Sequence, residues 1–370
     1  MKTILLRENQ VAEIVKILQQ GGTVAFRTET VYGLGADATN DIAVQKIFKA
    51  KGRPSSNPLI VHFHNLAHLK SYFPNLSKAE ERILKTIKGA LTIVLPVPEG
   101  SPLAKTVLAG KATSAVRIPS CRFTRKIIKA SGVPLAAPSA NTSGRPSPTD
   151  WNAVADDLDG KIDAIVMGGR TQIGLESTVI KFCQSVSPRI EHNLPKICKN
   201  CKILVLRQGG VSLGELKRRT GMMVELALSK EDLEKSPGTR FKHYAPEFPV
   251  VVLSNFDEFL GLTYEKDYVV LGHSSQFNYT DQNVLFLGKN AKQVNANLFY
   301  LLREAERILK GSNKSKIVKK DGVVPLSSDE TYLKSSVKPK STEKIIIVEA
   351  LPQTDEYASA RERINKATQG

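Results

Sequence analysis

Short apolar strands alternate with amphipathic helices along the first half of the chain, and this alternation limits the possible fold more than any other feature. Residues 8–20 place apolar side chains such as Ile14 and Leu18 on one helical face. A second helix is expected from Asp41, its predicted N-cap, to Lys51, and a third over 78–88. Strands are predicted at 23–26, 59–61, 91–95, 114–118, 133–137, 162–166 and 177–182. Such an order of elements indicates an α/β domain with helices flanking a sheet.

The last third of the chain repeats this pattern on a smaller scale. Strands are predicted at 250–253, 268–271, 284–287 and 345–348, and helices at 297–310 and 357–366. With 370 residues, two domains are expected. We assign residues 1–228 to the first domain, 229–248 to a linker and 249–370 to a second, smaller α/β domain. Residues 311–344 are rich in Lys, Ser and Pro, which predicts a mobile insertion.

The charge balance of the chain points to an acidic ligand. There are 53 Lys and Arg against 36 Asp and Glu, a net charge of +17. Such a balance favours a nucleotide or a nucleic acid without choosing between them. Apolar runs fall short of the roughly 18–20 residues of a membrane span, and the N-terminal apolar run is too short for a signal peptide. We therefore expect a cytoplasmic protein that does not contact a membrane.

Two cations close the second predicted helix, directly before a rigid turn. Lys51 and Arg53 precede Pro54, and Asn57-Pro58 follows. Basic residues are ordinary at a helix C-terminus, where they complement the dipole. Arginine also clamps phosphate through two parallel hydrogen bonds, and lysine adds a point charge. Both interpretations stay open on these residues alone.

Several other predicted strands end in a polar or cationic residue. Arg117 and Arg207 end two strands, Ser177 opens another, and Ser139 and Asn141 follow a fourth. Each is compatible with a plain turn or surface position. Their repetition indicates a polar cleft at one edge of the sheet, where open α/β sheets bind ligands. The chain lacks a Gly-x-x-x-x-Gly-Lys-Ser/Thr loop, which disfavours a P-loop enzyme. Ser177 has no plausible base partner for a hydrolase triad.

The cysteines allow a weak metal hypothesis. Cys198 and Cys201 form one Cys-x-x-Cys pair, with Cys183 and His192 nearby in the sequence. Two such pairs are usual in a structural zinc site. We therefore favour free thiols over zinc.

Four motifs together resemble the threonylcarbamoyl-AMP synthase family, the YrdC-like domain, in its longer two-domain form. They are Thr28-Glu29-Thr30-Val31-Tyr32-Gly33-Leu34-Gly35-Ala36, Lys51-Gly52-Arg53-Pro54 with Asn57-Pro58-Leu59, Ala137-Pro138-Ser139-Ala140-Asn141, and Glu176-Ser177-Thr178-Val179. Ser236-Pro237-Gly238 with His243-Tyr244-Ala245-Pro246 is similar to the linker of that longer form. The resemblance implies a twisted, open mixed sheet with flanking helices, a linker and a Rossmann-like C-terminal domain.

The resemblance also implies an activity. Members of the family make threonylcarbamoyl-AMP and pyrophosphate from L-threonine, bicarbonate and ATP, with Mg²⁺ accompanying the ATP. A tRNA-threonylcarbamoyl transferase machinery then moves the group onto the adenosine next to certain anticodons. Weak direct contact with tRNA through the basic surface is compatible with the charge.

By motif position, the resemblance assigns a role to individual residues. Lys51 and Arg53 are the expected catalytic cations. The expected ATP contacts are Arg53, Asn57, Thr113, Ser139, Asn141, Ser147, Arg207 and Ser236. The expected threonine and carbamate contacts are Thr30, His62, Arg117, Ala137 and Ser177. Ser236 and Tyr244 of the linker are expected to close over the nucleotide.

The sequence departs from the family pattern at a few places. Arg27 and Gln208 stand where the family usually has proline, and Ser120-Cys121-Arg122 replaces a common Asp-His-Pro. Arg27 and Cys121 put details of the pocket edge in question. Two other classes of protein share part of this pattern. One is the carbamoyltransferase of hydrogenase maturation, which also contains a YrdC-like domain, and the other is a non-enzymatic RNA-binding protein. The former needs several paired Cys-x-x-Cys motifs, and the latter does not need the threonine-side residues.

Overall fold

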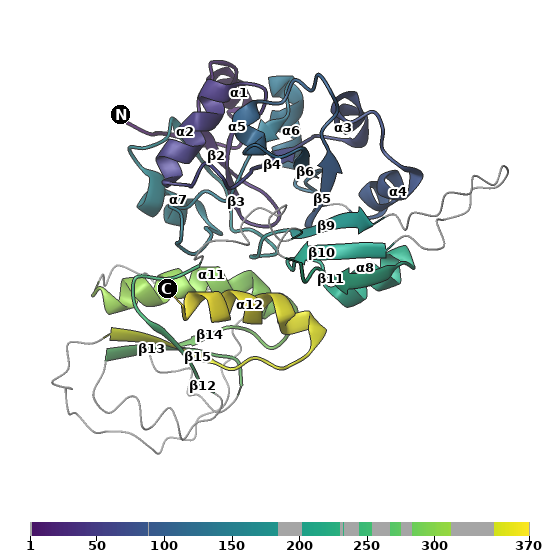
Figure 1. Ribbon diagram of the computed structural model, residues 1–370. Coiled ribbons are helices and arrows are strands. Elements are labelled where there is room, and N and C mark those ends of the chain that lie inside the picture. Colours follow the sequence, from purple (N-terminus) through teal and green to yellow (C-terminus); the bar gives the residue numbers. More distant parts are fainter. Residues whose placement is uncertain are drawn as a thin grey trace, which may run out of the picture.

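A computed structural model describes residues 2–87, 89–183, 202–229, 232, 244–253, 267–274, 283–311 and 344–369 (Figure 1). Ser236, His192, Cys198 and Cys201 lie outside the described residues, as does nearly all of the predicted insertion. Cys183 ends a strand. Within the described part of the chain, no helix combines the length and apolar character needed to cross a bilayer.

One large mixed sheet organises the first part of the chain. Its spatial order is β1-β8-β2-β3-β7-β4-β6-β5-β9-β10-β11. The strands are β1 (Ile4–Arg7), β2 (Val24–Arg27), β3 (Tyr32–Asp37), β4 (Ile60–His62), β5 (Leu91–Pro96), β6 (Thr113–Arg117), β7 (Leu135–Ala136), β8 (Ala164–Met167), β9 (Thr178–Cys183), β10 (Lys202–Arg207) and β11 (Met223–Leu226). β4 pairs parallel with β6, whereas β5 pairs antiparallel with β6 and parallel with β9. The predicted open mixed sheet is confirmed.

Helices cover both faces of this sheet. They are α1 (Val11–Gln19), α2 (Asp41–Lys51), α3 (Leu66–Tyr72), α4 (Lys78–Thr86), α5 (Lys105–Leu108), α6 (Arg122–Ser131), α7 (Trp151–Leu158) and α8 (Leu213–Thr220). Alternate β2 residues enter two separate cores: Ala25 packs with α2 and α7, and Phe26 packs with α1 and α6. This is the period of two that a strand buried on both faces requires.

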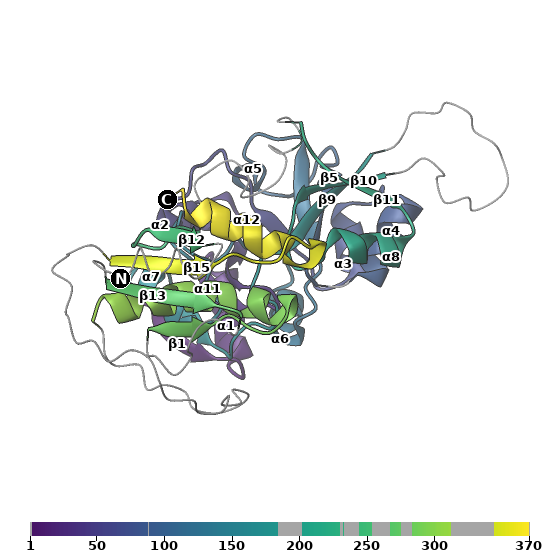
Figure 2. The ribbon, with the colours of Figure 1, turned by 90° about the horizontal axis from the view of Figure 1, so that it is seen from below.

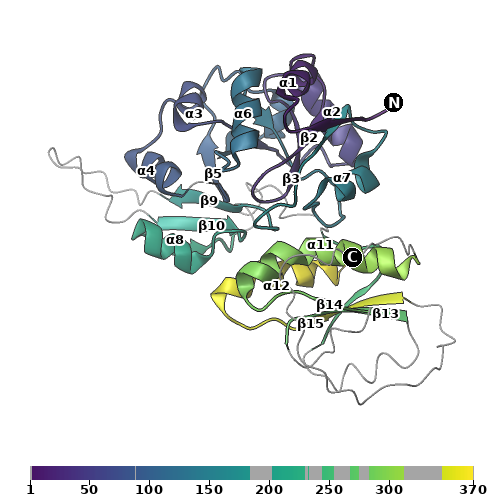
Figure 3. The ribbon, with the colours of Figure 1, turned by 180° about the vertical axis from the view of Figure 1, so that it is seen from behind.

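The C-terminal domain is a four-stranded parallel sheet backed by two helices. The strand order is β12-β15-β13-β14. The bounds are β12 (Val250–Leu253), β13 (Asp267–Gly272), β14 (Val284–Phe286), β15 (Lys344–Glu349), α11 (Ala291–Leu309), η1 (Asp355–Tyr357) and α12 (Ala358–Ala367). Figures 1 and 3 show α11 and α12 between this small sheet and the large domain. Viewed from below, β9–β11 and α8 extend past the area that the C-terminal domain covers (Figure 2).

Two local predictions were wrong in detail. Asn40, not Asp41, is the N-cap of α2, because the Asn40 side chain accepts hydrogen bonds from the amides of Ile42 and Ala43. The Asp41 carboxylate instead accepts from the Thr106 amide on α5. Helix α11 starts at Ala291, six residues before the expected start, with Asn290 as its N-cap. Both caps are asparagines, and a local pattern does not show which of two adjacent polar residues leaves the helix.

The two domains are in close contact. Val31 and Leu175 of the large domain belong to the same apolar core as Phe299 of α11. Gly174 has φ +76°, and a Cβ there would lie 2.4 Å from the carbonyl oxygen of Asn295. A side chain at 174 would therefore push α11 away from the large domain. The helix layer of the C-terminal domain is thus fitted to the loops that surround the large sheet.

Candidate active site

A cavity opens over the large sheet, beside the place where the C-terminal domain docks. Strands β3, β4, β6 and β10, the loops after β2, α2 and β7, and the residues just before β9 contribute to its wall. It is lined by Thr28, Thr30, Val31, Gly33, Arg53, Pro58, Ile60, His62, Arg117, Ala137, Pro138, Ser139, Asn141, Arg145, Ser147, Glu176, Ser177, Arg207 and Tyr244. Ten of these were predicted from the sequence as ATP or threonine contacts.

The strand register brings three polar side chains into one row. His62 pairs with Arg117 across β4 and β6, and Arg117 pairs with Thr92 across β6 and β5. Paired residues point to the same face of a sheet. The Thr92 hydroxyl lies 2.7 Å from the hydroxyl of Ser177, which extends the row to β9. The predicted threonine-side residues are therefore neighbours in space.

Arg117 is held in this row by a buried ion pair. Its Nη2 donates to Glu29 at 2.5 Å and to the Thr30 hydroxyl at 2.8 Å, while its Nε donates to the carbonyl of Gly89. Burial alone would raise the pKa of Glu29, but the Arg117 charge and hydrogen bond lower it below its ordinary value. The Cys121 amide also donates to Glu29. The sequence departure at 121 therefore keeps a backbone contact at the pocket edge.

The charge of His62 and the position of Arg27 complete the description of this wall. His62 is buried, and burial together with Arg117 lowers its pKa to about 3. The imidazole is therefore neutral near pH 7. Arg27 pairs with Glu8 at 3.0 Å and does not line the cavity.

Lys51 lies behind the cavity rather than in its wall. Its ammonium group is buried and donates to the carbonyl oxygens of Ser139 and Asn141, each at 2.5 Å. Burial, with a smaller contribution from Arg53, lowers its pKa well below the ordinary value. Lys51 thus fixes the backbone of the 139–141 turn, from beneath the side chains that face the cavity.

Arg53 and Arg207 crowd positive charge into the cavity. Arg53 donates to the backbone carbonyls of Asn57 and Pro58, and no carboxylate among the described residues pairs with it. Burial, followed by the charge of Arg207, lowers the pKa of Arg53 to about 9. Arg207 donates to the Ser177 carbonyl at 2.8 Å. An anion bound between these groups would relieve their repulsion and replace lost water.

Glu176 is the acidic residue of the described cavity wall. It accepts a 2.5 Å hydrogen bond from Ser147 and pairs with Arg363 of α12 at 3.3 Å. Burial would raise its pKa, but Arg363, Arg207 and Ser147 lower it. The C-terminal domain therefore supplies a buried charge directly behind the cavity.

Tyr244 of the linker closes part of the cavity. It is 4% exposed, adopts φ 69° and stacks on Phe299 with ring centroids 5.1 Å apart. Arg363 lies over the same ring at 5.5 Å. Of the two linker residues expected at the nucleotide, Tyr244 is at the cavity and Ser236 lies outside the described residues.

Three predicted contacts do not line the cavity. Asn57 is buried beneath Arg53 and Lys51 is behind the turn, whereas Thr113 starts β6 and is four residues from Arg117. At about 3.3 Å per residue, Thr113 is about 13 Å along the strand from that arginine. Their roles stay predictions. Sequence reasoning missed Thr92, Glu29, Arg145 and Glu176 as site residues. The last three stood inside or beside the motifs already singled out, which was the available signal.

No metal centre is built into the described residues, which contain no cluster of three His, Cys, Asp or Glu side chains. The cavity itself combines buried guanidinium groups, hydroxyls and a neutral imidazole. Together with the mixed sheet, it defines an α/β protein with a buried, cationic cavity suited to small anionic and polar ligands.

Comparison with known proteins identifies the family. Residues 16–191 match the Sua5/YciO/YrdC family model described as "Telomere recombination", and residues 211–369 match the model "Threonylcarbamoyl-AMP synthase, C-terminal domain". The chain is 37% identical over 304 residues to the threonylcarbamoyl-AMP synthase of Pyrococcus abyssi, covering 78% of this chain and 83% of that protein. It is 40% identical over 252 residues to the Bacillus subtilis enzyme, covering 67% and 68%.

Solved structures agree over the whole length. The crystal structure of P. abyssi Sua5 complexed with L-threonine aligns with a TM-score of 0.73 and 30% identity, covering 100% of this chain and 98% of that one. The chain belongs to the threonylcarbamoyl-AMP synthase family, in its two-domain form. The match of residues 211–369 to that family's own C-terminal domain also disfavours the hydrogenase-maturation alternative.

Proposed function

We propose that this chain synthesises threonylcarbamoyl-AMP and pyrophosphate from L-threonine, bicarbonate and ATP. The observation that carries the proposal is the pairing of two unlike walls in one cavity. Arg53 and Arg207 crowd buried positive charge into this cavity, and the row of His62, Arg117 and Ser177 also lines it, with Ser177 in contact with Arg207. A phosphate donor and a small zwitterion are the two ligand classes that such walls suit.

On the threonine side, Arg117 is proposed to bind the substrate carboxylate. Its Nε and Nη2 are used by Gly89, Glu29 and Thr30, whereas Nη1 makes no hydrogen bond to a described residue. One edge of the Arg117 guanidinium is thereby fixed, while its Nη1 stays available to donate to the substrate carboxylate. The neutral imidazole of His62 and the hydroxyl of Ser177 would contact the other polar groups of threonine, and neither would add a charge to the site.

On the nucleotide side, the turn 139–147 and the two buried arginines are proposed to hold ATP. Ser139, Asn141 and Ser147 present short polar groups at the cavity. Arg53 and Arg207 would stabilise the triphosphate, and Lys51 would keep the turn in place from behind. Mg²⁺ would enter with ATP and be held mainly by phosphate oxygens, because Glu176 is already paired with Arg363 and Ser147.

The proposed chemistry needs charge stabilisation more than a strong base. The threonine amine combines with bicarbonate to give a carbamate and water. A carbamate oxygen then attacks the α-phosphorus of ATP, and the bond to the bridging oxygen of pyrophosphate breaks. Arg53 and Arg207 would stabilise negative charge on the α-phosphate and the departing pyrophosphate.

The downstream partners are part of the same proposal. The product would be passed to a tRNA-threonylcarbamoyl transferase machinery, which modifies the adenosine next to the anticodon. The net charge of +17 supports weak contact between the basic surface and tRNA. We place the activity in the cytoplasm, as the short apolar runs of the sequence predict.

Pyrophosphate release tests the function. Purified protein with Mg²⁺, ATP, bicarbonate and labelled threonine should release pyrophosphate and form a labelled adenylate, and omission of either threonine or bicarbonate should stop both. Arg53→Ala should reduce turnover at least about 100-fold, because it removes a charge from the transition state. Lys126→Ala, an exposed change on α6, is the control. Pyrophosphate release that is independent of threonine would contradict the proposal.

A further inference from the structure

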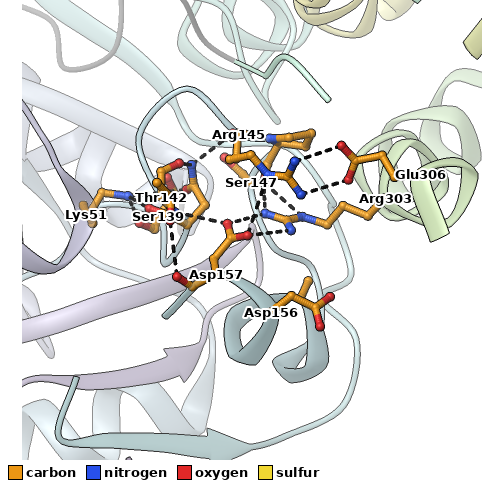
Figure 4. Close-up of polar contacts among 12 residues, drawn as sticks. Lys51, Ser139, Thr142, Arg145, Ser147, Asp156, Asp157, Arg303 and Glu306 are labelled. Carbon is orange, nitrogen blue, oxygen red and sulfur yellow. Dashed lines mark hydrogen bonds and ion pairs between the residues drawn. The ribbon is translucent and has the colours of Figure 1, made fainter. Parts of the chain in front are cut away.

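Two ion pairs cross between the domains in opposite directions (Figure 4). Arg303 of α11 binds Asp157 of α7, with Nη2–Oδ2 and Nη1–Oδ1 distances of 2.7 and 3.2 Å. Glu306, three residues further along α11, binds Arg145 of the large domain, with distances of 2.9 and 3.0 Å. Both contacts are bidentate, which is the geometry that fixes orientation as well as distance.

Three of the four side chains in these pairs are removed from solvent, whereas Arg145 is partly exposed and also pairs with Glu247. Arg303 and Glu306 are each 3% exposed, and Asp157 is 7% exposed. Removing one partner of such a pair leaves the other charge buried without compensation. The pairs therefore fix the orientation of α11 relative to the large domain, in addition to holding the two domains together.

The group that they hold is the turn proposed to bind ATP. Arg303 also donates to the Pro146 carbonyl at 2.5 Å, one residue before Ser147. Asp157 accepts from the Thr142 amide at 3.1 Å, one residue after Asn141. Asn141 in turn donates to the Arg145 carbonyl at 3.0 Å. Thus α11 contacts the 145–146 end of the segment directly and its start only through Asp157, while Lys51 holds that start from the opposite side (Figure 4).

The threonine wall has a different support. His62 and Arg117 are placed by the β4–β6 register, and Ser177 precedes β9. Among the described residues, none of these three side chains forms a hydrogen bond or an ion pair with α11. Loss of the Arg303 or Glu306 ion pair should therefore affect the nucleotide side of the cavity before the threonine side.

We propose that Arg303 and Glu306 are positioning residues of the ATP site, so that helix α11 of the C-terminal domain contributes to the structure of that site. The proposal rests on the proposed function for the identity of the nucleotide. It assigns to α11 the task of keeping the 141–147 segment in the conformation that receives ATP.

The test uses full-length variants with a matched control on the same helix. Arg303→Met and Glu306→Gln remove one member of each pair at similar size, and Arg303→Lys keeps the charge but loses the planar fork. Arg307→Met is the control, because Arg307 also crosses to the large domain, through Asp156, but this pair is half-exposed and does not contact the 141–147 segment. Affinities for Mg²⁺–ATP and for L-threonine are measured separately by calorimetry, with hydrogen exchange of residues 139–147.

We expect Arg303→Met to weaken ATP binding about 10- to 100-fold, as displacement of a positioned group does, with threonine affinity within about twofold. Glu306→Gln and Arg303→Lys should give smaller losses of the same selectivity, with faster exchange at 139–147. Arg307→Met should match the wild type. ATP affinity within twofold of wild type in both Arg303→Met and Glu306→Gln would overturn the proposal, even if their melting temperatures fall.

The readouts also separate this proposal from the proposed function. If Arg303→Met does not fold, Glu306→Gln and Arg303→Lys decide. If the wild type neither binds ATP nor releases pyrophosphate, the function fails, and hydrogen exchange alone still tests whether α11 holds the segment. Unchanged exchange at 139–147 in the variants would then refute the positioning role.

Discussion

The buried pair between Arg117 and Glu29 offers the sharpest test of the site electrostatics. Both side chains are about 5% exposed or less, and their contact distance is 2.5 Å. Arg117→Met removes the cation and keeps an apolar chain of similar length. Glu29 then stays buried, with the amide of Cys121 as a remaining hydrogen-bond donor. We expect the substitution to lower the free energy of unfolding of the large domain by about 3–5 kcal/mol at pH 7.5.

The pH dependence of this loss has a definite sign. In the wild type the pKa of Glu29 is lowered, so the stability that it contributes is present above the ordinary carboxyl pKa and is lost as the pH falls through the folded value. Without Arg117, burial dominates and the pKa of Glu29 rises. The variant should therefore regain stability as the pH is lowered from 7.5 to 5.5, over a range in which Glu29 of the wild type stays ionised.

Trp151 makes the measurement specific. It is the single tryptophan of the chain, and it lies in α7 against the core of the large domain. Urea unfolding followed by its fluorescence reports the large domain without a tryptophan signal from the C-terminal domain. The double variant Arg117→Met/Glu29→Gln should recover about 1–3 kcal/mol relative to Arg117→Met. An Arg117→Met loss that is below about 1 kcal/mol, or that grows between pH 7.5 and 5.5, would refute the reasoning.

Three further predictions concern the cavity and the cysteines. Lys51→Met should reduce turnover at least about 100-fold by releasing the 139–141 turn. The control Lys49→Met, at an exposed position on the same helix, should keep the wild-type rate. If both variants turn over at the wild-type rate, Lys51 has no part in the mechanism. Because the pKa of His62 is lowered to about 3, threonine affinity in calorimetry should show no step between pH 5.5 and 7.5, and a step near pH 6.5 that disappears in His62→Asn would contradict a neutral imidazole. Metal analysis of freshly purified protein should find zinc far below one equivalent, and a stoichiometric content would overturn the assignment of Cys198 and Cys201 as free thiols.

The parts of the fold that depend on local sequence signals could be predicted from the sequence. Apolar periodicity predicted most strands and helices within a few residues, and the motif positions predicted ten residues of the cavity wall. The row that joins His62, Arg117 and Thr92 could not be predicted, because it depends on the register of strands that are distant in the sequence. The inter-domain pairs were missed for the same reason, since Arg303 and Asp157 are 146 residues apart. The sequence singled out Lys51, but its burial behind the turn could not be predicted, because it depends on how that turn folds.

The crossed arrangement of the inter-domain pairs affects how salt acts on the molecule. Each domain contributes one cation and one anion to the contact: Arg145 and Asp157 on one side, Glu306 and Arg303 on the other. The charges that each domain contributes to these two pairs thus cancel before the domains meet. The chain's large positive charge therefore neither favours nor opposes docking of the domains through these pairs. Ions within a Debye length of about 8–10 Å screen exposed charges far more than buried ones. Raising the ionic strength should therefore weaken the proposed contact of the basic surface with tRNA while the two domains stay docked.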